Sequence, residues 1–401
     1  MNFKEQAANI SSYIIEKRRW IHSHAELAFK EEETTAYIAG ELEKMGIEVQ
    51  LFPDYYGVIG TIRGEKPAKT VMLRADIDAL PIEEKSGVVF PAHNKGVMHA
   101  CGHDCHSSML LGAARMLADN RKELCGTVKL LFQSAEESCH GANYYVEKGY
   151  LDDVDALLGM HVWASMEAGY INIEDGYRMA SCDNFKITVE GSSVHGSTPH
   201  LGKDAIVAAS SIIMNLQTFV SRENDPLNPM VVTVGTVKAG KQFNIIADCV
   251  EMEGTIRTYG VEMREKVQNE LGRIVSHTAE ALGCRAKFIN TPIEPPVVNS
   301  NIEINEIARD AAKVLYGENI LKTMPKVMGS EDMSILMQKV PGVMCFLGYY
   351  NEACGSVYPL HSERFCVDET ILPKGAALYA QFAHDYLKKT AAQPGKVGQT
   401  L

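Results

Sequence analysis

The chain has 401 residues, 46% of them hydrophobic and 22% charged, which is enough apolar material for a large core and about two or three domains. A net charge of −12 without any basic run argues against binding to nucleic acid or anionic lipid. No apolar run approaches the roughly 18 residues of a membrane span, and the N-terminus lacks the layout of a signal peptide. We therefore expect a cytoplasmic protein with ten reduced cysteines and no membrane partner.

Apolar spacing predicts that helices and strands alternate through the first half of the chain. Two amphipathic helices come first, at 3–20 and 32–45, and the second stops at Gly46. The later elements are strands at 57–64 and 69–78, a helix at 107–120, and strands at 126–137 and 156–162. This alternation favours an α/β sheet that helices cover on both faces.

A second pattern begins at residue 183. It consists of a strand at 183–191, a helix at 204–220, strands at 229–237 and 249–259, a helix at 261–282 and a strand at 284–292. The order βαββαβ is typical of a ferredoxin-like domain. Two consecutive prolines at 295 and 296 mark the return linker. We predict one catalytic domain from 1–182 and 294–401, completed by a helix at 370–388, with 183–293 inserted into it.

Polar clusters recur at or near the ends of the predicted strands. They occupy residues 74–78, 98–106, 134–137, 160–161 and 359–365. Ligands of open α/β sheets bind beyond the carboxyl ends of the strands. Because burying unpaired polar groups is costly, the repeated placement predicts that the clusters share one site.

The side chains in these clusters predict a metal centre. Cys101 and His103 stand two apart in a loop of small residues, where both can turn toward one point, and a thiolate and an imidazole suit a borderline-soft divalent ion. The remaining ligands would be Glu137, His161 and His361. Five ligands exceed the needs of one tetrahedral ion and predict two divalent ions roughly 3.5–4 Å apart. The alternative for Cys101 is an inert buried thiol.

Carboxylates near these ligands suggest acid–base chemistry. Glu136 adjoins Glu137, so one can bind metal while the other faces a water whose pKa the metal lowers toward about 7. A free carboxylate there can take the proton and hand it to a leaving amine. The alternative is a solvated pair of loop carboxylates. Asp78 is the candidate to accept the second N–H of a metal-binding histidine, with Asp76 as an outer contact, unless both cap the next turn.

Three residues of the inserted domain are candidates for substrate binding. Arg257 lies on a predicted strand and could hold a carboxylate through two hydrogen bonds, and Asn244 lies thirteen residues before it. His195, in a loop of small residues, could donate to a developing oxyanion. Taken singly, a surface histidine and a structural arginine are the simpler interpretations.

At this point the sequence resembles the aminoacylase and hippurate hydrolase type of amidohydrolase, a dinuclear metallopeptidase family that includes indole-acetyl-amino-acid hydrolases. The matching stretches run in order over nearly the whole chain: RRWIHSHAELAFKEEET (18–34), LRADIDALPIEE (73–84), GVMHACGHDCHSSMLLGAA (96–114), QSAEE (133–137), GMHV (159–162), HGSTPHLGKDAI (195–206), GTIRTY (254–259), GSEDM (329–333), VPGVMCFLG (340–348) and LHSERF (360–365). Where the family usually has proline, this chain has Ala25, Ser134 and Glu363, which bears on the shape of the pocket.

The resemblance implies a catalytic α/β domain with an inserted lid that also forms a homodimer. It implies two divalent ions, commonly Mn, Zn, Co or Ni, on the five residues Cys101, His103, Glu137, His161 and His361. It implies that Glu136 is the general base, that substrate carboxylate and oxyanion are bound by Arg257, Asn244 and His195, and that this histidine reaches the partner's active site. The implied substrate is an N-acyl amino acid, cleaved to an acid and a free amino acid.

Other functions remain open on the sequence alone. A dipeptidase, carbamoylase or deacetylase could use the same scaffold. A metal-binding interaction protein with a degenerate site would bind metal without turnover. A redox thiol protein needs paired reactive cysteines, and the one close pair, Cys101 and Cys105, lacks the C-x-x-C spacing.

Overall fold

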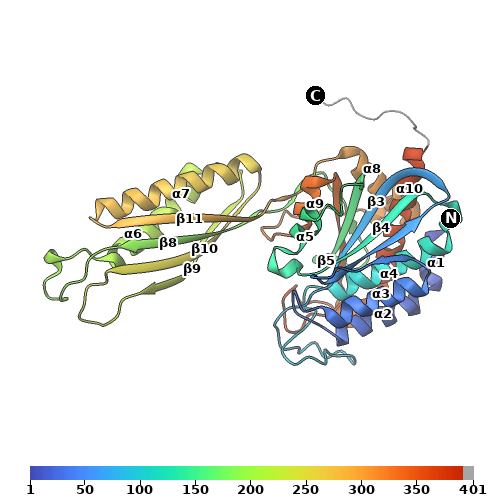
Figure 1. Ribbon diagram of the computed structural model, residues 1–401, viewed down its shortest axis with the longest axis horizontal. Coiled ribbons are helices and arrows are strands. Elements are labelled where there is room, and N and C mark those ends of the chain that lie inside the picture. Colours follow the sequence, from blue (N-terminus) through green and yellow to red (C-terminus); the bar gives the residue numbers. More distant parts are fainter. Residues whose placement is uncertain (392–401) are drawn as a thin grey trace. The chain divides into compact units, whose positions relative to one another are not determined.

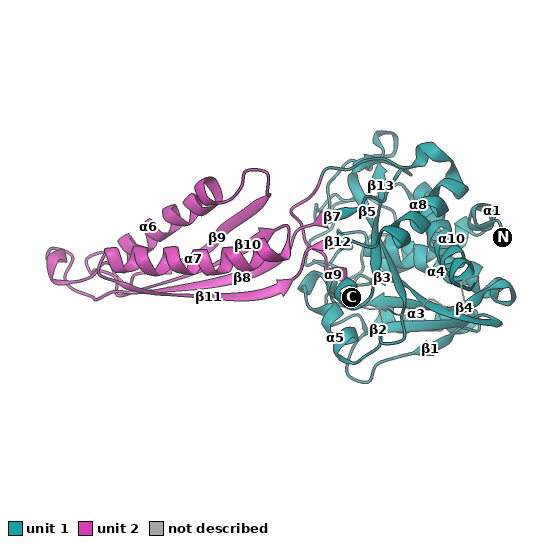
Figure 2. Ribbon diagram, turned by 90° about the horizontal axis from the view of Figure 1, so that it is seen from above, with its two compact units in different colours: residues 1–176, 298–325, 335–401 teal, residues 177–297, 326–334 magenta. Residues whose placement is uncertain are grey.

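The computed structural model describes residues 1–391 (Figure 1). These divide into two compact units (Figure 2): unit 1 comprises residues 1–176, 298–325 and 335–391, and unit 2 comprises Tyr177–Val297 and Lys326–Ser334. The predicted insertion at 183–293 falls within unit 2, which extends beyond it at both ends. Unit 2 also takes in residues 326–334, which the sequence pattern had assigned to the catalytic domain.

Backbone contacts explain why this short segment belongs to unit 2. The N–H of Ala180 donates to the carbonyl of Gly329 at 2.9 Å, and Met179 forms a parallel bridge with Val327. These pairings join residues about 150 positions apart. A periodicity measured along the chain cannot reveal such a pairing.

Unit 1 is built on a mixed seven-stranded sheet of order β1-β2-β4-β3-β5-β13-β6 (Figure 1). Its strands are β1 (Glu48–Gln50), β2 (Gly57–Arg63), β3 (Lys66–Asp76), β4 (Cys125–Gln133), β5 (Ala156–Glu167), β6 (Ile171–Asn172) and β13 (Gly342–Tyr350). The four central strands, β4, β3, β5 and β13, are parallel, whereas the outer pairs are antiparallel. The carboxyl ends of the central strands therefore share one edge.

The helices of unit 1 are α1 (Phe3–Asn9), α2 (Ser11–Ser23), α3 (Glu32–Lys44), α4 (His103–Asp119), α5 (Gly141–Glu147), α8 (Ile302–Tyr316), α9 (Met333–Lys339, shared at its start with unit 2) and α10 (Leu372–Ala391). Helix α10 packs on α1, α4, α8 and β3 and helps to bury one continuous apolar cluster. The predicted helix at 3–20 is two helices, because Ile10 has non-helical angles (φ −102°, ψ 16°).

Unit 2 contains β8 (Cys182–Glu190), α6 (Ala205–Thr218), β9 (Met230–Ala239), β10 (Cys249–Thr258), α7 (Val261–Ala281) and β11 (Arg285–Glu294), in the chain order βαββαβ. The four strands form an antiparallel sheet of order β11-β8-β10-β9. Helices and sheet enclose a separate core, to which Ile187, Ile212 and Leu271 contribute. Two further short strands, β7 (Gly176–Met179) and β12 (Val297–Asn299), pair with each other.

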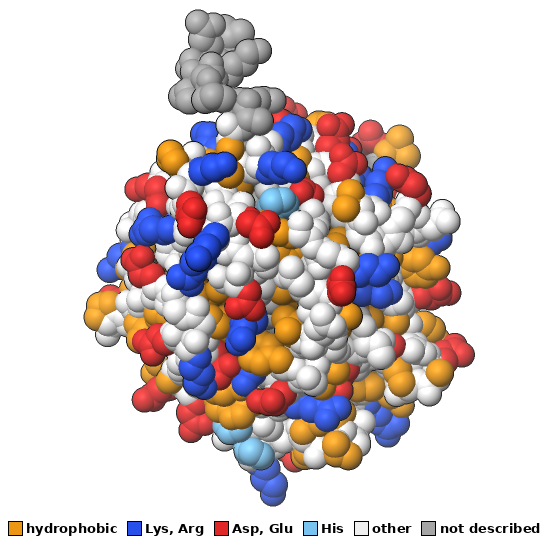
Figure 3. Space-filling model, turned by 90° about the vertical axis from the view of Figure 1, so that its right-hand side faces the viewer, with side chains coloured by type: hydrophobic (Ala, Val, Ile, Leu, Met, Phe, Trp, Pro, Cys, Tyr) orange, Lys and Arg blue, Asp and Glu red, His pale blue; other side chains and the backbone are white. Residues whose placement is uncertain are grey.

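The surface gives no sign of a single-charge patch in the view of Figure 3. Lysine and arginine side chains lie intermixed with aspartate and glutamate across this face. Among the helices that the structure describes, none has the length and apolar character of a membrane span.

Candidate functional site

The ends of neighbouring parallel strands collect the polar clusters at one edge of the unit 1 sheet. Asp76, the last residue of β3, pairs with Gln133, the last residue of β4. In the next parallel pair, His161 of β5 lies opposite Phe346 of β13. Residues that follow parallel strands meet at this edge, which is where open α/β sheets bind ligands.

Five side chains with metal-binding atoms come together there. Sγ of Cys101 lies 3.4 Å from Nε2 of His161. Oε1 of Glu137 lies 3.4 Å from Nε2 of His361 and 3.9 Å from Nε2 of His103. The donor atoms of Cys101, His103 and His161 all lie within 4.8 Å of one another, and so do those of Cys101, Glu137 and His361. The structure thus brings together all five residues that the sequence predicts as ligands.

Hydrogen bonds determine which nitrogen of two histidines faces the cluster. Nδ1 of His161 donates to the carbonyl of Val162 at 2.7 Å, which leaves Nε2 with its lone pair. Nδ1 of His103 lies 3.1 Å from Oδ1 of Asp78, and Nε2 is buried without a hydrogen-bond partner. Asp78 therefore lies where a carboxylate that orients a metal-binding histidine is expected.

Helix α4 begins at His103, four residues before the predicted start at 107. The ligand candidate is thus the first residue of a helix rather than part of a loop. Gly102 precedes it with φ 87°, and a Cβ there would come within 2.5 Å of Cγ2 of Val162. A glycine at this position lets Cys101 and His103 approach the sheet closely.

Asp76 lies closer to His106 than to any of the predicted ligands. Its Oδ1 accepts from Nδ1 of His106 at 2.6 Å, and its Oδ2 accepts from Nη1 of Arg74 at 2.8 Å. Nε2 of His106 accepts from the backbone N–H of Val162 at 2.9 Å. Both ring nitrogens of His106 are therefore engaged, and this residue links β3 to β5 instead of offering a ligand atom.

Three non-glycine residues around the cluster have a left-handed backbone: Ala135 (φ 62°), Cys139 (φ 62°) and His361 (φ 64°). Each such residue costs roughly 1–2 kcal/mol and persists only where its surroundings hold it. The N–H of His361 donates to the carbonyl of Ala100 at 2.8 Å. The other two residues flank the 3-10 turn η2 (Glu136–Ser138).

This turn presents two adjacent carboxylates to the same histidine. Oε2 of Glu136 lies 3.8 Å and Oε1 of Glu137 lies 3.9 Å from Nε2 of His103. Glu136 is buried, with 8% of its surface exposed, and Glu137 is partly buried. A carboxylate beside ligand atoms has the position required of a general base.

Spacing and burial both fit divalent ions. Ligand distances of about 2.0–2.3 Å place two donors of one tetrahedral ion about 3.3–3.8 Å apart, close to the separations of 3.4–3.9 Å in this cluster. Nε2 of His103 and Oε1 of Glu137 are buried without hydrogen bonds. Such atoms are costly unless a cation satisfies them.

The electrostatics of the cluster also suit a cation. Burial raises the pKa of the Cys101 thiol well above its ordinary value, and the carboxylates of Glu137 and Glu136 raise it further. Burial acts to lower the pKa of His103, but Asp76 and Asp78 outweigh it and raise the pKa to about 10. Carboxylates that favour positive charge on a buried histidine would equally favour a divalent ion, which in turn would stabilise the thiolate.

In unit 2, two of the predicted substrate-binding residues are neighbours. His195 and Ile245 form an antiparallel bridge, and the N–H of Gly196 donates to the carbonyl of Asn244 at 2.8 Å. Nδ1 of His195 accepts from the N–H of Ser197 at 3.1 Å, which leaves the proton on Nε2. His195 is exposed, and the buried Oδ1 of Asn244 has no hydrogen-bond partner.

Arg257, the third of these residues, lies on β10 and is partly buried. Its Nη1 donates to Oγ of Ser330 at 2.8 Å. Ser330 belongs to the matched stretch GSEDM, to which the sequence analysis assigned no role. The sequence match thus included Ser330, but only the placement of 326–334 in unit 2 shows that this serine lies beside Arg257.

Glu31 is the other residue near the cluster that sequence analysis missed. It is fully buried, and its two carboxylate oxygens contact the chain just before η2. It lies within the matched stretch at 18–34, yet nothing in the local pattern separates it from Glu32 and Glu33, which begin helix α3.

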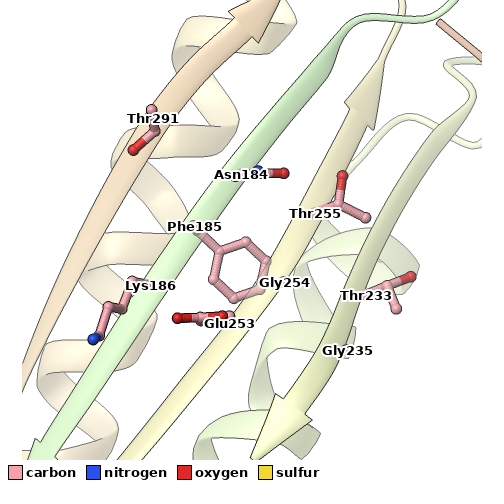
Figure 4. A pocket seen from close by; sticks show the side chains of 9 residues that line it. All are labelled: Asn184, Phe185, Lys186, Thr233, Gly235, Glu253, Gly254, Thr255 and Thr291. Atoms are coloured by element: carbon pink, nitrogen blue, oxygen red, sulfur yellow. The ribbon is translucent and has the colours of Figure 1, made fainter. Parts of the chain in front are cut away.

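A pocket of about 530 Å³ on the sheet of unit 2 is a separate feature (Figure 4). Its lining includes Phe185, Lys186 and Glu253. A Cβ on Gly254 would come within 2.3 Å of Cζ of Phe185, so the ring lies tightly against this glycine. None of the predicted catalytic, ligand or substrate-binding residues lines this pocket.

Comparison with known proteins gives a consistent result. Residues 72–385 match the model of the peptidase family M20/M25/M40. Thermostable carboxypeptidase 2 of Saccharolobus solfataricus is 40% identical over 393 residues, which cover 96% of this chain and 98% of that protein. N-acetyl-L-cysteine deacetylase of Bacillus subtilis is 36% identical over 381 residues, which cover 94% and 90% of the two chains.

A solved structure agrees in fold and in sequence. The Bacillus subtilis YXEP protein, described as a dinuclear metal-binding peptidase, superimposes with a TM-score of 0.84 at 34% identity. The match covers 95% of this chain and 99% of that chain.

Proposed function

Because the chain belongs to the M20/M25/M40 family of peptidases, it is a hydrolase of amide bonds, and we propose that it cleaves N-acyl amino acids to a carboxylic acid and a free amino acid. The observation that carries this proposal is the pair of carboxylates on η2. Glu137 lies among the ligand atoms, and the buried Glu136 lies beside them.

The metal centre in this proposal consists of two divalent ions, of Mn, Zn, Co or Ni. They would be held by Cys101, His103, Glu137, His161 and His361. When bound, such ions lower the pKa of a water and polarise the carbonyl of the amide. Asp78 keeps His103 in the tautomer whose Nε2 faces the cluster.

Glu136 acts as the general base. It takes a proton from the attacking water and passes it to the nitrogen of the leaving amino acid. This transfer contributes roughly 10²–10⁴-fold to the rate. The orphaned Nε2 of His103 and the contacts within 4 Å of both carboxylates support the assignment of these neighbouring roles.

Unit 2 supplies the substrate-binding residues in this proposal. Arg257 holds the carboxylate of the amino acid, and Asn244 contributes its side-chain amide. His195 carries a proton on an exposed Nε2, which supports its role as donor to the oxygen on which charge develops.

We further propose that unit 2 is a ferredoxin-like lid through which the cytoplasmic protein forms a homodimer. Strand β9 is an edge strand, and edge strands offer unpaired backbone groups to a second chain. Large apolar side chains are exposed on the same unit: Ile206, Val207 and Met214 on α6, and Val231 and Val237 on β9. Sedimentation velocity tests this, since Met214→Glu should shift a dimer toward monomer while Val314→Glu, on the exposed face of α8, should not.

A dipeptidase or carboxypeptidase is the main alternative, which the name of the Saccharolobus solfataricus relative favours. Deacetylases and carbamoylases share the chemistry and differ in the acyl group that leaves. A panel of N-acetyl, N-benzoyl, N-carbamoyl and aminoacyl amino acids separates these possibilities by the product released.

The deciding experiment compares the wild type, Glu136→Gln and Glu147→Gln on this panel at matched metal content. Glu147 is exposed at the end of α5 and serves as the control. We expect amino acid release by the wild type and the control, and a loss of about 100-fold or more in Glu136→Gln. Equal activity in Glu136→Gln would exclude Glu136 as the base. A metal-loaded wild type that cleaves nothing on the panel would exclude the proposed substrate class.

A further inference from the structure

We propose that Glu31 is a positioning residue, whose buried carboxylate holds the start of the turn that carries Glu136 and Glu137. This inference rests on the proposed function for its catalytic consequence. Its consequence for metal binding can be measured independently of any substrate.

Both oxygens of Glu31 contact the two residues that precede the turn. Oε1 accepts from the backbone N–H of Ala135 at 2.8 Å, and Oε2 accepts from the hydroxyl of Ser134 at 2.7 Å. Glu31 is 0% exposed, so the protein surroundings rather than water determine the geometry of these bonds. Hydrogen bonds to a charged group are among the stronger ones.

The position of these bonds matters because Ala135 has the left-handed backbone that turns the chain from β4 into η2. This left-handed conformation is unfavourable for alanine, because its Cβ comes too close to the backbone. The bond from its N–H to Glu31 stabilises the residue in this conformation. Loss of the bond would let the turn relax, and a shift of about 1 Å in reacting groups can cost roughly 10²-fold in rate.

A second buried carboxylate holds the middle of the same turn. Oδ2 of Asp78 accepts from the backbone N–H of Glu137 at 2.9 Å. Asp78 follows β3, whereas Glu31 precedes α3. Two segments far apart in the chain therefore bond to the backbone of the turn, at Glu137 and at Ala135. Asp78 also orients His103, whereas the carboxylate of Glu31 bonds to Ser134 and Ala135, neither of which is a predicted ligand. The effect of Glu31 therefore passes through the backbone of the turn.

The hydroxyl of Ser134 makes the second of the two bonds to Glu31. Here the N–H of Ser134 also receives support, because it donates to the hydroxyl of Tyr145 at 3.3 Å. Ser134→Ala removes the bond to Glu31 and leaves the one to Ala135, so it provides a graded test.

The experiment uses the full chain in four variants: Glu31→Ala, Glu31→Gln, Ser134→Ala and Glu26→Gln. Glu26 is the matched control, because its carboxylate accepts from the backbone N–H of Glu33 at 3.1 Å and of Thr34 at 2.8 Å, at the start of α3 rather than in the turn. Metal-depleted protein is titrated with Co²⁺ and followed by visible absorption. Metal-loaded protein is assayed for kcat and KM below the unfolding temperature of every variant.

We expect Glu31→Ala to weaken Co²⁺ binding about 10–100-fold, the usual range for residues that support a metal site. It should lower kcat by a similar factor with little change in KM. Glu31→Gln retains an acceptor for the N–H of Ala135, so it should keep most of the Co²⁺ affinity and kcat of the wild type. The Co²⁺ affinity and kcat of Glu26→Gln should equal those of the wild type.

Wild-type Co²⁺ affinity and kcat in folded Glu31→Ala would overturn the proposal, and so would equal losses in the control. If Glu31→Ala does not fold, Ser134→Ala decides: a loss of about two- to tenfold in Co²⁺ affinity supports the proposal, and no loss overturns it. If the wild type binds Co²⁺ but cleaves no N-acyl amino acid, the proposed function fails, and the Co²⁺ titrations still decide the role of Glu31.

Discussion

Asp78 accepts a hydrogen bond from the backbone N–H of Glu137 at 2.9 Å, while its other carboxylate oxygen lies 3.1 Å from Nδ1 of His103. One side chain thus orients two predicted ligands on different elements. We expect Asp78→Asn to lower metal affinity about 10–100-fold, because an amide can satisfy only one of these two donors. Isothermal titration of metal-depleted protein with Mn²⁺ measures this. Asp54→Asn, at an exposed carboxylate bonded to Tyr144, should bind like the wild type.

His106 should prove structural. Both of its ring nitrogens are used, by Asp76 and by the N–H of Val162, so its removal leaves buried partners unpaired. We expect His106→Ala to lose roughly 1–3 kcal/mol of unfolding free energy or more in denaturant titrations. The folded variant should keep the metal stoichiometry of the wild type by elemental analysis. A reduced stoichiometry in His106→Ala would mean that this histidine is itself a ligand.

Gly102 permits the approach of Cys101 and His103 to the sheet. Gly102→Ala combines a left-handed backbone (φ 87°) with a Cβ placed 2.5 Å from Cγ2 of Val162. Gly87→Ala is the matched control, since Gly87 has a similar φ of 78° but no atom within 4 Å of the added Cβ. Both variants should lose roughly 1–2 kcal/mol of unfolding free energy, because each places an alanine in a left-handed backbone conformation. Only Gly102→Ala should also lose metal affinity. Equal metal affinity in the two variants would contradict the steric explanation.

The stability of the metal-depleted protein should depend on pH through Glu31. Burial first, and then the charge of Asp78, raise the pKa of Glu31 from 4.5 to about 7. A folded-state pKa above the unfolded value means that stability is fully present below about pH 4.5 and is lost as the pH rises through about 7.

Glu31→Gln removes this titration while keeping a similar shape. The unfolding free energy of the wild type should therefore fall relative to that of Glu31→Gln between about pH 4.5 and 7, by about 1.4 kcal/mol for each unit of pKa difference. Urea denaturation at several pH values measures the difference. A constant difference across this range would show that the pKa of Glu31 is not raised.

Local patterns along the chain were sufficient for much of the fold. Period-two and period-3.6 spacing predicted most strands and helices, including the βαββαβ order of elements in unit 2. The misses are local as well: the break at Ile10 and the start of α4 at His103 depend on backbone angles that apolar spacing does not encode. The assignment of 326–334 to unit 2 depends on pairing with Met179 and Ala180, far away along the chain.

The sequence by itself determined which side chains gather at the site, because thiol, imidazole and carboxylate groups stand at the ends of strands that a parallel sheet must bring to one edge. Only the tertiary structure decided how these groups are held. Glu31 lies 104 residues from Ala135 and Asp78 lies 59 residues from Glu137, and Ser330 lies 73 residues from Arg257. A hydrogen bond between distant residues depends on packing in three dimensions, so no spacing of residues along the chain predicts it.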